Sequence, residues 1–187
     1  MAERPLRRPV VMVAGATNDE FAPEVPKYRR LLGDAFRGFS GTVISGGTAQ
    51  GIAGIVGDLA ATHPAVHAVG YIPAALPPGA SADSRYAEVR RTSGHGFSAA
   101  EPLQAWVDVI AAGIEPAAVA VLGVGGGEIA VLEYRLAVAL GARVGLIEGS
   151  GVEVDEILAS LPGAVVKLPA AAAAIAAFIE DGNALTG

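Results

Sequence analysis

The sequence predicts a doubly wound, mostly parallel α/β sheet of the Rossmann-like class, with helices on both faces. Runs of β-branched and other apolar residues alternate with helical patterns along the chain, which is typical of a sheet covered on both sides. Several of these runs end in glycines, as strands do that turn directly into helices. The 187 residues suit one domain, which we expect over 1–187 with an ordered core at 9–182.

The first part of the chain predicts three strands and two helices. Five apolar residues form a strand at 10–14, and apolar residues at helical spacing predict a helix at 23–36. The residues Gly-Thr-Val-Ile-Ser form a strand at 41–45, and a glycine-rich turn leads into a helix at 51–61. The apolar run at 66–72 predicts the third strand.

The segment 73–99 breaks this alternation, with at most one short helix near 84–90. Long irregular segments in compact domains usually carry function, so we expect it to cover a ligand. The alternation then resumes. Strands are predicted at 118–124, 144–148 and 164–168, and helices at 100–112, from the triple glycine to 140, at 153–160 and at 170–180.

Composition excludes several classes of protein. With 52% hydrophobic and 17% charged residues the chain is not disordered, and no apolar run is long enough to cross a membrane. The absence of cysteine excludes disulfides, a zinc ribbon and a thiol nucleophile. A net charge of −6 opposes binding of DNA or RNA. The first apolar run is too short for a signal peptide, so we expect a cytoplasmic protein.

Small and polar residues follow four of the predicted strands. In an open α/β sheet, ligands bind beyond the carboxyl ends of the strands, where glycines let the backbone donate hydrogen bonds to an anion. We therefore predict a nucleotide or phosphate site there. Its candidate residues are Gly15, Ala16, Thr17 and Asn18; Gly46, Gly47, Thr48 and Gly51; and Gly125, Gly126, Gly127 and Glu128, with the turn 149–151 nearby.

The common nucleotide fingerprints do not match. The loop 46–51 lacks the Lys-Ser/Thr pair of a phosphate-binding Walker loop, and Glu128 stands where a dinucleotide fingerprint has its third glycine. No Gly-x-Ser-x-Gly elbow is present, so a serine hydrolase has no support. His63 and His67 lack a partner pattern for a metal, and we predict neither a metal site nor a cofactor.

The sequence resembles the SLOG superfamily. The resemblance rests on Val43-Ile-Ser-Gly-Gly-Thr-Ala-Gln-Gly-Ile-Ala-Gly54, Val69-Gly-Tyr-Ile-Pro73 and Gly125-Gly-Gly-Glu-Ile-Ala-Val-Leu-Glu133. The segments Phe97-Ser-x-x-Glu101-Pro-Leu-Gln104 and Leu132-Glu-Tyr-Arg135 are similar to signatures of its prokaryotic branch related to the SLOG region of melastatin-type TRP channels. The superfamily also includes the LOG-type phosphoribohydrolases. The resemblance implies a Rossmann-like sheet that binds nucleotide-derived ligands, and a homodimer.

Two functions are compatible with this resemblance. The channel-like branch implies a domain that binds or senses an ADP-ribose-like or NAD-derived ligand. LOG enzymes instead cleave nucleoside monophosphates, and Glu133 matches the final glutamate of their Pro-Gly-Gly-x-Gly-Thr-x-x-Glu motif. The proline of that motif is replaced by Gly125 and its Gly-Thr pair by Ile129-Ala130, which weakens the case for hydrolysis. Glu133 would hold a ribose in a sensor and be catalytic in a hydrolase.

Each remaining candidate residue has an alternative structural role. Arg90 or Arg91 could bind a diphosphate with the guanidinium fork, or lie in solvent. Tyr71 or Phe97 could stack on a base, or pack inside a loop. The side chain of Asn18 could contact the ligand or cap a helix.

Overall fold

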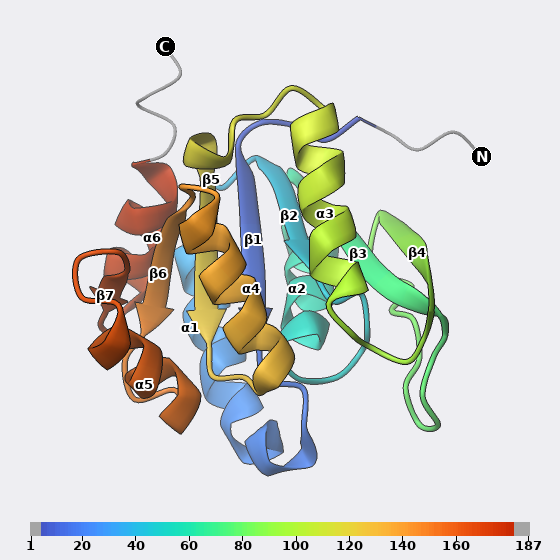
Figure 1. The fold of residues 1–187 in the computed structure, drawn as a ribbon, viewed down its shortest axis with the longest axis horizontal. Coiled ribbons are helices and arrows are strands. Elements are labelled where there is room, and N and C mark those ends of the chain that lie inside the picture. The colour runs from blue at the N-terminus through green and yellow to red at the C-terminus, as the bar shows by residue number, and fades with distance from the viewer. Residues whose placement is uncertain (1–4, 182–187) are drawn as a thin grey trace.

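The fold is a single seven-stranded parallel sheet between two layers of helices, and the predicted class is confirmed (Figure 1). The computed structural model describes residues 5–181, so Gly182, the last residue of the predicted core, lies outside the described residues. The strand order is β4-β3-β2-β1-β5-β6-β7. The strands are β1 (Val10–Gly15), β2 (Gly41–Ser45), β3 (Val66–Ala75), β4 (Glu88–His95), β5 (Val119–Val124), β6 (Arg143–Ile147) and β7 (Val166–Leu168).

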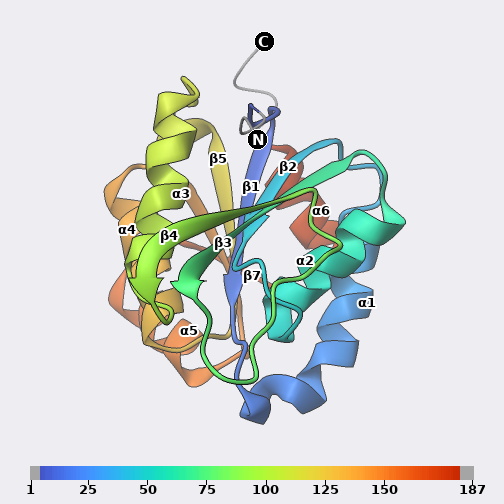
Figure 2. The same ribbon diagram turned by 90° about the vertical axis from the view of Figure 1, so that its right-hand side faces the viewer.

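Six α-helices cover the two faces of the sheet. They are α1 (Val25–Ala35), α2 (Gly51–Thr62), α3 (Ala100–Ala111), α4 (Glu128–Ala139), α5 (Val152–Ser160) and α6 (Ala172–Glu180). Apolar residues of α1, α2 and α6 form one core layer, and those of α3, α4 and α5 form the other. Figure 2 shows these two layers on either side of the sheet. Within residues 5–181, no helix is long and apolar enough to span a membrane.

The predicted elements differ from the structure at two places. The first helix begins later than expected, because a short 3-10 helix (Asp19–Glu24) precedes α1. A second 3-10 helix (Pro116–Ala118) precedes β5. The side chain of Asn18 caps the first of these, accepting a hydrogen bond from the backbone N–H of Phe21 at 3.2 Å. The second difference concerns the irregular segment.

Part of the segment 73–99 is regular. Its first residues extend β3 to Ala75, and Glu88–His95 form β4, where a short helix was the alternative. The prediction missed β4 because its residues are polar, which an edge strand tolerates since only one of its sides pairs with the sheet. Its buried charge, Arg90, is neutralised by Glu88 and by Asp108 of α3.

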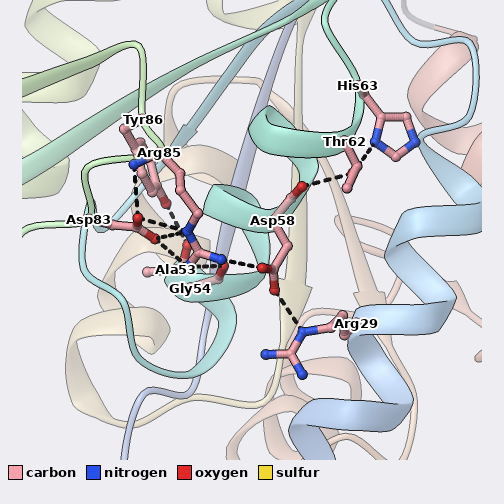
Figure 3. A network of polar contacts seen from close by, with 9 residues as sticks. All are labelled: Arg29, Ala53, Gly54, Asp58, Thr62, His63, Asp83, Arg85 and Tyr86. Carbon is pink, nitrogen blue, oxygen red and sulfur yellow. Dashed lines mark hydrogen bonds and ion pairs between the residues drawn. The ribbon is translucent and has the colours of Figure 1, made fainter.

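The remaining loop, residues 76–87, is fastened to α2 and to the loop after β2. The guanidinium of Arg85 donates to Asp83, to the carbonyl oxygen of Gly54 and to Asp58 (Figure 3). Asp58 also pairs with Arg29 of α1 at 2.7 Å. This network joins the loop to α1 and α2. The loop also reaches the carboxyl edge of the sheet, where the backbone N–H of Asp83 donates to the carbonyl oxygen of Gly47.

Candidate functional site

A cavity of about 420 Å³ lies at the carboxyl ends of β1 and β2, between the first turns of α3 and α4. The chain runs outward from β1 through β2 and β3 to β4, then returns through α3 to β5 on the other side of β1. The order of the strands therefore reverses between β1 and β5. Ligands bind at this reversal in open α/β sheets, and the cavity has the volume of a typical small-molecule site.

The structure brings eleven of the predicted site residues to this cavity. They come from the loops after β1 and β2, from β3, from the segment before α3 and from α4. They are Gly15, Ala16, Thr17, Asn18, Gly46, Thr48, Tyr71, Phe97, Gly127, Glu128 and Glu133.

The other predicted glycines do not line the cavity but shape the loops around it. Gly51 has a φ of 53°, and a Cβ there would press on the carbonyl oxygen of Ala16 and lie 2.6 Å from the Cα of Thr17. The next residue, Ile52, donates its backbone N–H to the same Ala16 oxygen at 3.0 Å. The N-terminus of α2 is thus joined to the loop after β1. Gly47, Gly125 and Gly126 likewise lie in tight turns behind the lining.

Neither predicted arginine lines the cavity. The guanidinium of Arg90 is buried and donates to Glu88 at 3.0 Å and to Asp108 at 2.6 Å. The exposed Arg91 reaches the carbonyl oxygens of Pro73 and Ala74 on β3. Among the described residues, no lysine or arginine lines the cavity. An anionic ligand would therefore depend on backbone N–H groups.

The N-terminus of α4 supplies such groups. Gly127 is its N-cap residue, and the N–H groups of Glu128, Ile129 and Ala130 have no acceptor in the described part of the chain. All four residues line the cavity. The first turn of a helix concentrates free donors and positive dipole potential, which favours an anion at this point.

A tyrosine of α4 joins β1 to the loop after β5, across the strand reversal. The hydroxyl of Tyr134 donates to the carbonyl oxygen of Gly125 after β5 at 2.6 Å and lies 3.3 Å from that of Ala14 in β1. Burial raises the pKa of this phenol well above its usual value, so it remains a donor. The spacing between β1 and the loop after β5 is therefore set by a side chain inside the core.

Sequence reasoning missed Glu101 as a cavity residue. Its buried carboxylate accepts hydrogen bonds from the hydroxyl of Thr92 and from the backbone N–H of Ser98 at 2.8 Å, and the Ser98 hydroxyl accepts from Ala100 at 3.1 Å. These bonds resemble a capping box placed one residue before the N-cap Ala99, and the Ser-x-x-Glu spacing before an apolar helix is the signal that could have found Glu101. The other lining residues outside the prediction are Val13, Ala14, Ser45, Ala53, Ser98, Pro102, Ile129 and Ala130.

Glu133 is the one cavity carboxyl group that is deep in the protein without a hydrogen-bond partner among residues 5–181. Protein atoms surround this carboxyl group on most sides, and its remaining surface borders the cavity. For this reason the residue as a whole is half-buried. Burial raises its pKa to about 8. At neutral pH the side chain is therefore mostly protonated and can donate a hydrogen bond.

The fold is similar to those of several solved structures. A molybdenum cofactor carrier protein from Chlamydomonas reinhardtii is 18% identical, with a TM-score of 0.67 over 95% of this chain and 99% of that one. A molybdenum cofactor binding protein from Rippkaea orientalis is 18% identical, with a TM-score of 0.65 over 97% and 99%. The structural genomics target TM1055 is 20% identical, with a TM-score of 0.68 over 92% and 98%.

The sequence itself gives no closer assignment. No family model matches it, and a comparison with curated proteins finds no relative. Identities of 18–20% establish a shared fold. They do not assign a function, which has to be argued from the residues of the site. The chain thus has the Rossmann-like fold of these carrier and binding proteins.

Proposed function

We propose that the protein binds a phosphorylated nucleotide-type ligand, ADP-ribose-like, NAD-derived or related, in the cavity at the strand reversal. The observation that carries this proposal is the N-terminus of α4, where three residues with free N–H groups line a cavity of suitable volume. The phosphate would lie against Gly127 and Glu128, with Thr17 in the facing loop as a further donor. Phe97 and Tyr71 would border the organic part of the ligand.

The similar folds support a binding role. Two of the proteins with this fold are described as carrying or binding the molybdenum cofactor, a small molecule. That cofactor therefore joins the ligands worth testing here, beside ADP-ribose, NAD and AMP. Binding by any of them would raise the melting temperature, since a ligand that binds only the folded state stabilises it.

Gly127→Asp tests where the phosphate binds. Gly127 has ordinary extended backbone angles, and a Cβ there would meet no atom within 4 Å. Aspartate is also a better N-cap than glycine, so we expect unchanged or slightly higher stability. The new carboxylate would occupy the phosphate position, and we expect affinity to fall at least about tenfold from charge repulsion. Isothermal titration with the ligand that stabilises the protein measures this.

Gly127→Asn is the matched control, because it has the same shape and capping ability without the charge. We expect its affinity to stay within about threefold of the unmodified protein. Equal losses in both variants would show that side-chain bulk matters and not charge. Unchanged affinity in Gly127→Asp would place the phosphate elsewhere.

Hydrolysis of a nucleoside monophosphate is the second candidate, and the position of Glu133 in the cavity favours it. A protonated glutamate beside the sugar could protonate a departing base. Incubation with nucleoside monophosphates, followed by chromatography of the free base, separates the two functions. Turnover that Glu133→Ala abolishes would establish the hydrolase, whereas stabilisation without turnover supports the binding protein.

We further propose that α3 and α4 form the interface of a homodimer. The apolar residues of α3 divide into two groups in the structure, because Trp106 is buried while Leu103, Val107 and Ile110 are 48–57% exposed. The neighbouring α4 exposes Ile129 and Leu132 on the same side of the sheet (Figure 1).

The charges on α4 suit a second copy of the chain. Glu128 and Arg135 are both exposed, lie two turns apart on either side of Leu132, and form no ion pair within the described residues. When two copies of α4 pack antiparallel about a two-fold axis near Leu132, each Arg135 faces the Glu128 of the other copy. The apolar residues between them are then covered.

Leu132→Glu tests this interface. In the dimer, the two introduced carboxylates and the carboxylates of the two Glu128 residues would bring four negative charges near the axis. We expect the dimer to become a monomer, measured by sedimentation velocity. Val166→Glu is the control, because Val166 is also exposed but lies on β7 at the far edge of the sheet. A monomeric unmodified protein, or dissociation by both substitutions alike, would contradict the proposed interface.

A further inference from the structure

The cavity narrows into a recess of about 40 Å³ between α3, α4 and the strands. Its walls are mostly apolar and include Met12, Ile44, Trp106 and Val121. Two carboxyl groups, those of Glu101 and Glu133, border both the cavity and the recess. A ligand that fills the cavity therefore places its innermost atoms beside these two groups.

The two glutamates differ in their surroundings. The oxygens of Glu101 accept hydrogen bonds from Thr92 and Ser98, and this fixes the carboxylate at the start of α3. The carboxyl group of Glu133 has no such partner within residues 5–181. Glu133 is thus the group that the fold leaves available to a ligand.

The charged and titratable groups around Glu133 provide nothing to stabilise its negative charge. Glu101 of α3 and Glu128 of α4 are acidic, and the phenols of Tyr71 and Tyr134 are neutral because burial raises the pKa of each. The buried cation Arg90 donates to Tyr71, which lines the cavity, and is paired with Asp108 and Glu88. A proton on Glu133 is the arrangement that these neighbours favour.

We infer that Glu133 is a neutral hydrogen-bond donor, and that the ligand turns a hydrogen-bond acceptor, such as a ring nitrogen or carbonyl oxygen of its heterocycle, toward it. This rests on the proposed function and adds to it the orientation of the ligand. The phosphate lies at the first turn of α4, and the acceptor edge of the heterocycle lies beside Glu133 at the mouth of the recess. It differs from a role in which ionised Glu133 accepts hydrogen bonds from ribose hydroxyls.

The experiment measures affinity against pH with AMP and ADP-ribose as probes. Between about pH 7 and pH 9.5 the phosphate charge is constant, so Glu133 is the cavity group that changes. We expect the Kd of the unmodified protein to rise about tenfold over this interval. Glu133→Gln keeps a donor of the same shape, so its Kd at pH 7 should stay within about threefold and show no pH dependence.

Glu156→Gln is the matched control, because it removes one exposed negative charge from α5, outside the lining of the cavity. It should keep the pH dependence of the unmodified protein. Affinity that rises with pH, together with weaker binding by Glu133→Gln at every pH, would overturn the inference in favour of an ionised carboxylate.

Titration of the ligand-free protein separates this inference from the proposed function. The ¹³C chemical shift of the Glu133 carboxyl carbon, assigned by comparison with Glu133→Gln, should titrate near pH 8. A midpoint near 4.5, the ordinary value, would overturn the inference even when a probe binds. Failure of every probe to bind, with a midpoint near 8, would instead overturn the proposed function and leave the neutral donor established.

Discussion

Replacing Glu133 with glutamine is expected to stabilise the folded protein at high pH. Burial raises the pKa of this carboxyl group from 4.5 to about 8. Below pH 4.5 both the folded and the unfolded chain hold the proton, so this group does not affect stability. Between pH 4.5 and 8 only the folded chain holds it, and rising pH therefore favours unfolding.

Glutamine removes this dependence because it does not titrate. At about pH 9 the free energy of unfolding of the variant should exceed that of the unmodified protein by up to about 5 kcal/mol, since each tenfold difference in proton affinity corresponds to about 1.4 kcal/mol. Urea denaturation across pH measures the difference. Near pH 4.5 the two proteins should agree, and Glu128→Gln should show no comparable gain at any pH. A constant difference across this range would mean that packing, and not ionisation, separates the variants.

Gly51→Val is expected to cost the protein about 3–5 kcal/mol of unfolding free energy. The backbone at this position has a φ of 53°, which a β-branched residue rarely adopts. Its Cβ would also press on backbone atoms of Ala16 and Thr17, which cannot move aside as a flexible side chain can. The loop after β1 would be displaced, so ligand binding should weaken together with stability. Chemical denaturation and isothermal titration measure the two effects.

Gly33→Ala is the matched control, because Gly33 lies inside α1 and a Cβ there would meet no atom within 4 Å. This substitution should stabilise the protein by about 0.5–1 kcal/mol, the usual gain when alanine replaces glycine within a helix. If Gly51→Val were tolerated as well as Gly33→Ala, the close contact between the β1 loop and α2 would not be a requirement of the fold.

The fold could be predicted because its signals are local. Apolar runs such as Val10–Gly15 mark buried parallel strands, and the glycines after them mark turns into helices. The same turns indicated the site, because the carboxyl ends of parallel strands meet at one edge. For this reason Gly15, Gly46 and Gly127 could be predicted to line one cavity from their positions in the sequence.

The remaining features depend on contacts between distant residues. Arg90 pairs with Asp108, which lies 18 residues further along, and no local pattern distinguishes this pair from a ligand-binding arginine. The polar strand β4 forms because β3 provides a paired edge, so its own residues give little sign of it. Glu101 did have a local signal, the Ser-x-x-Glu spacing from Ser98, but that signal describes a helix start and gives no indication that the carboxylate borders a cavity.

Tyr134 has a consequence for the thermodynamics of recognition. Its hydroxyl ties the end of β5 to β1 from within the core, and it does so before any ligand arrives. The backbone beside the cavity at these strand ends is therefore preorganised, and little conformational entropy is lost by the protein on association. The selectivity of the site then depends on how well the shape of a ligand fits the cavity. A flexible ligand would lose most of the conformational entropy that binding costs.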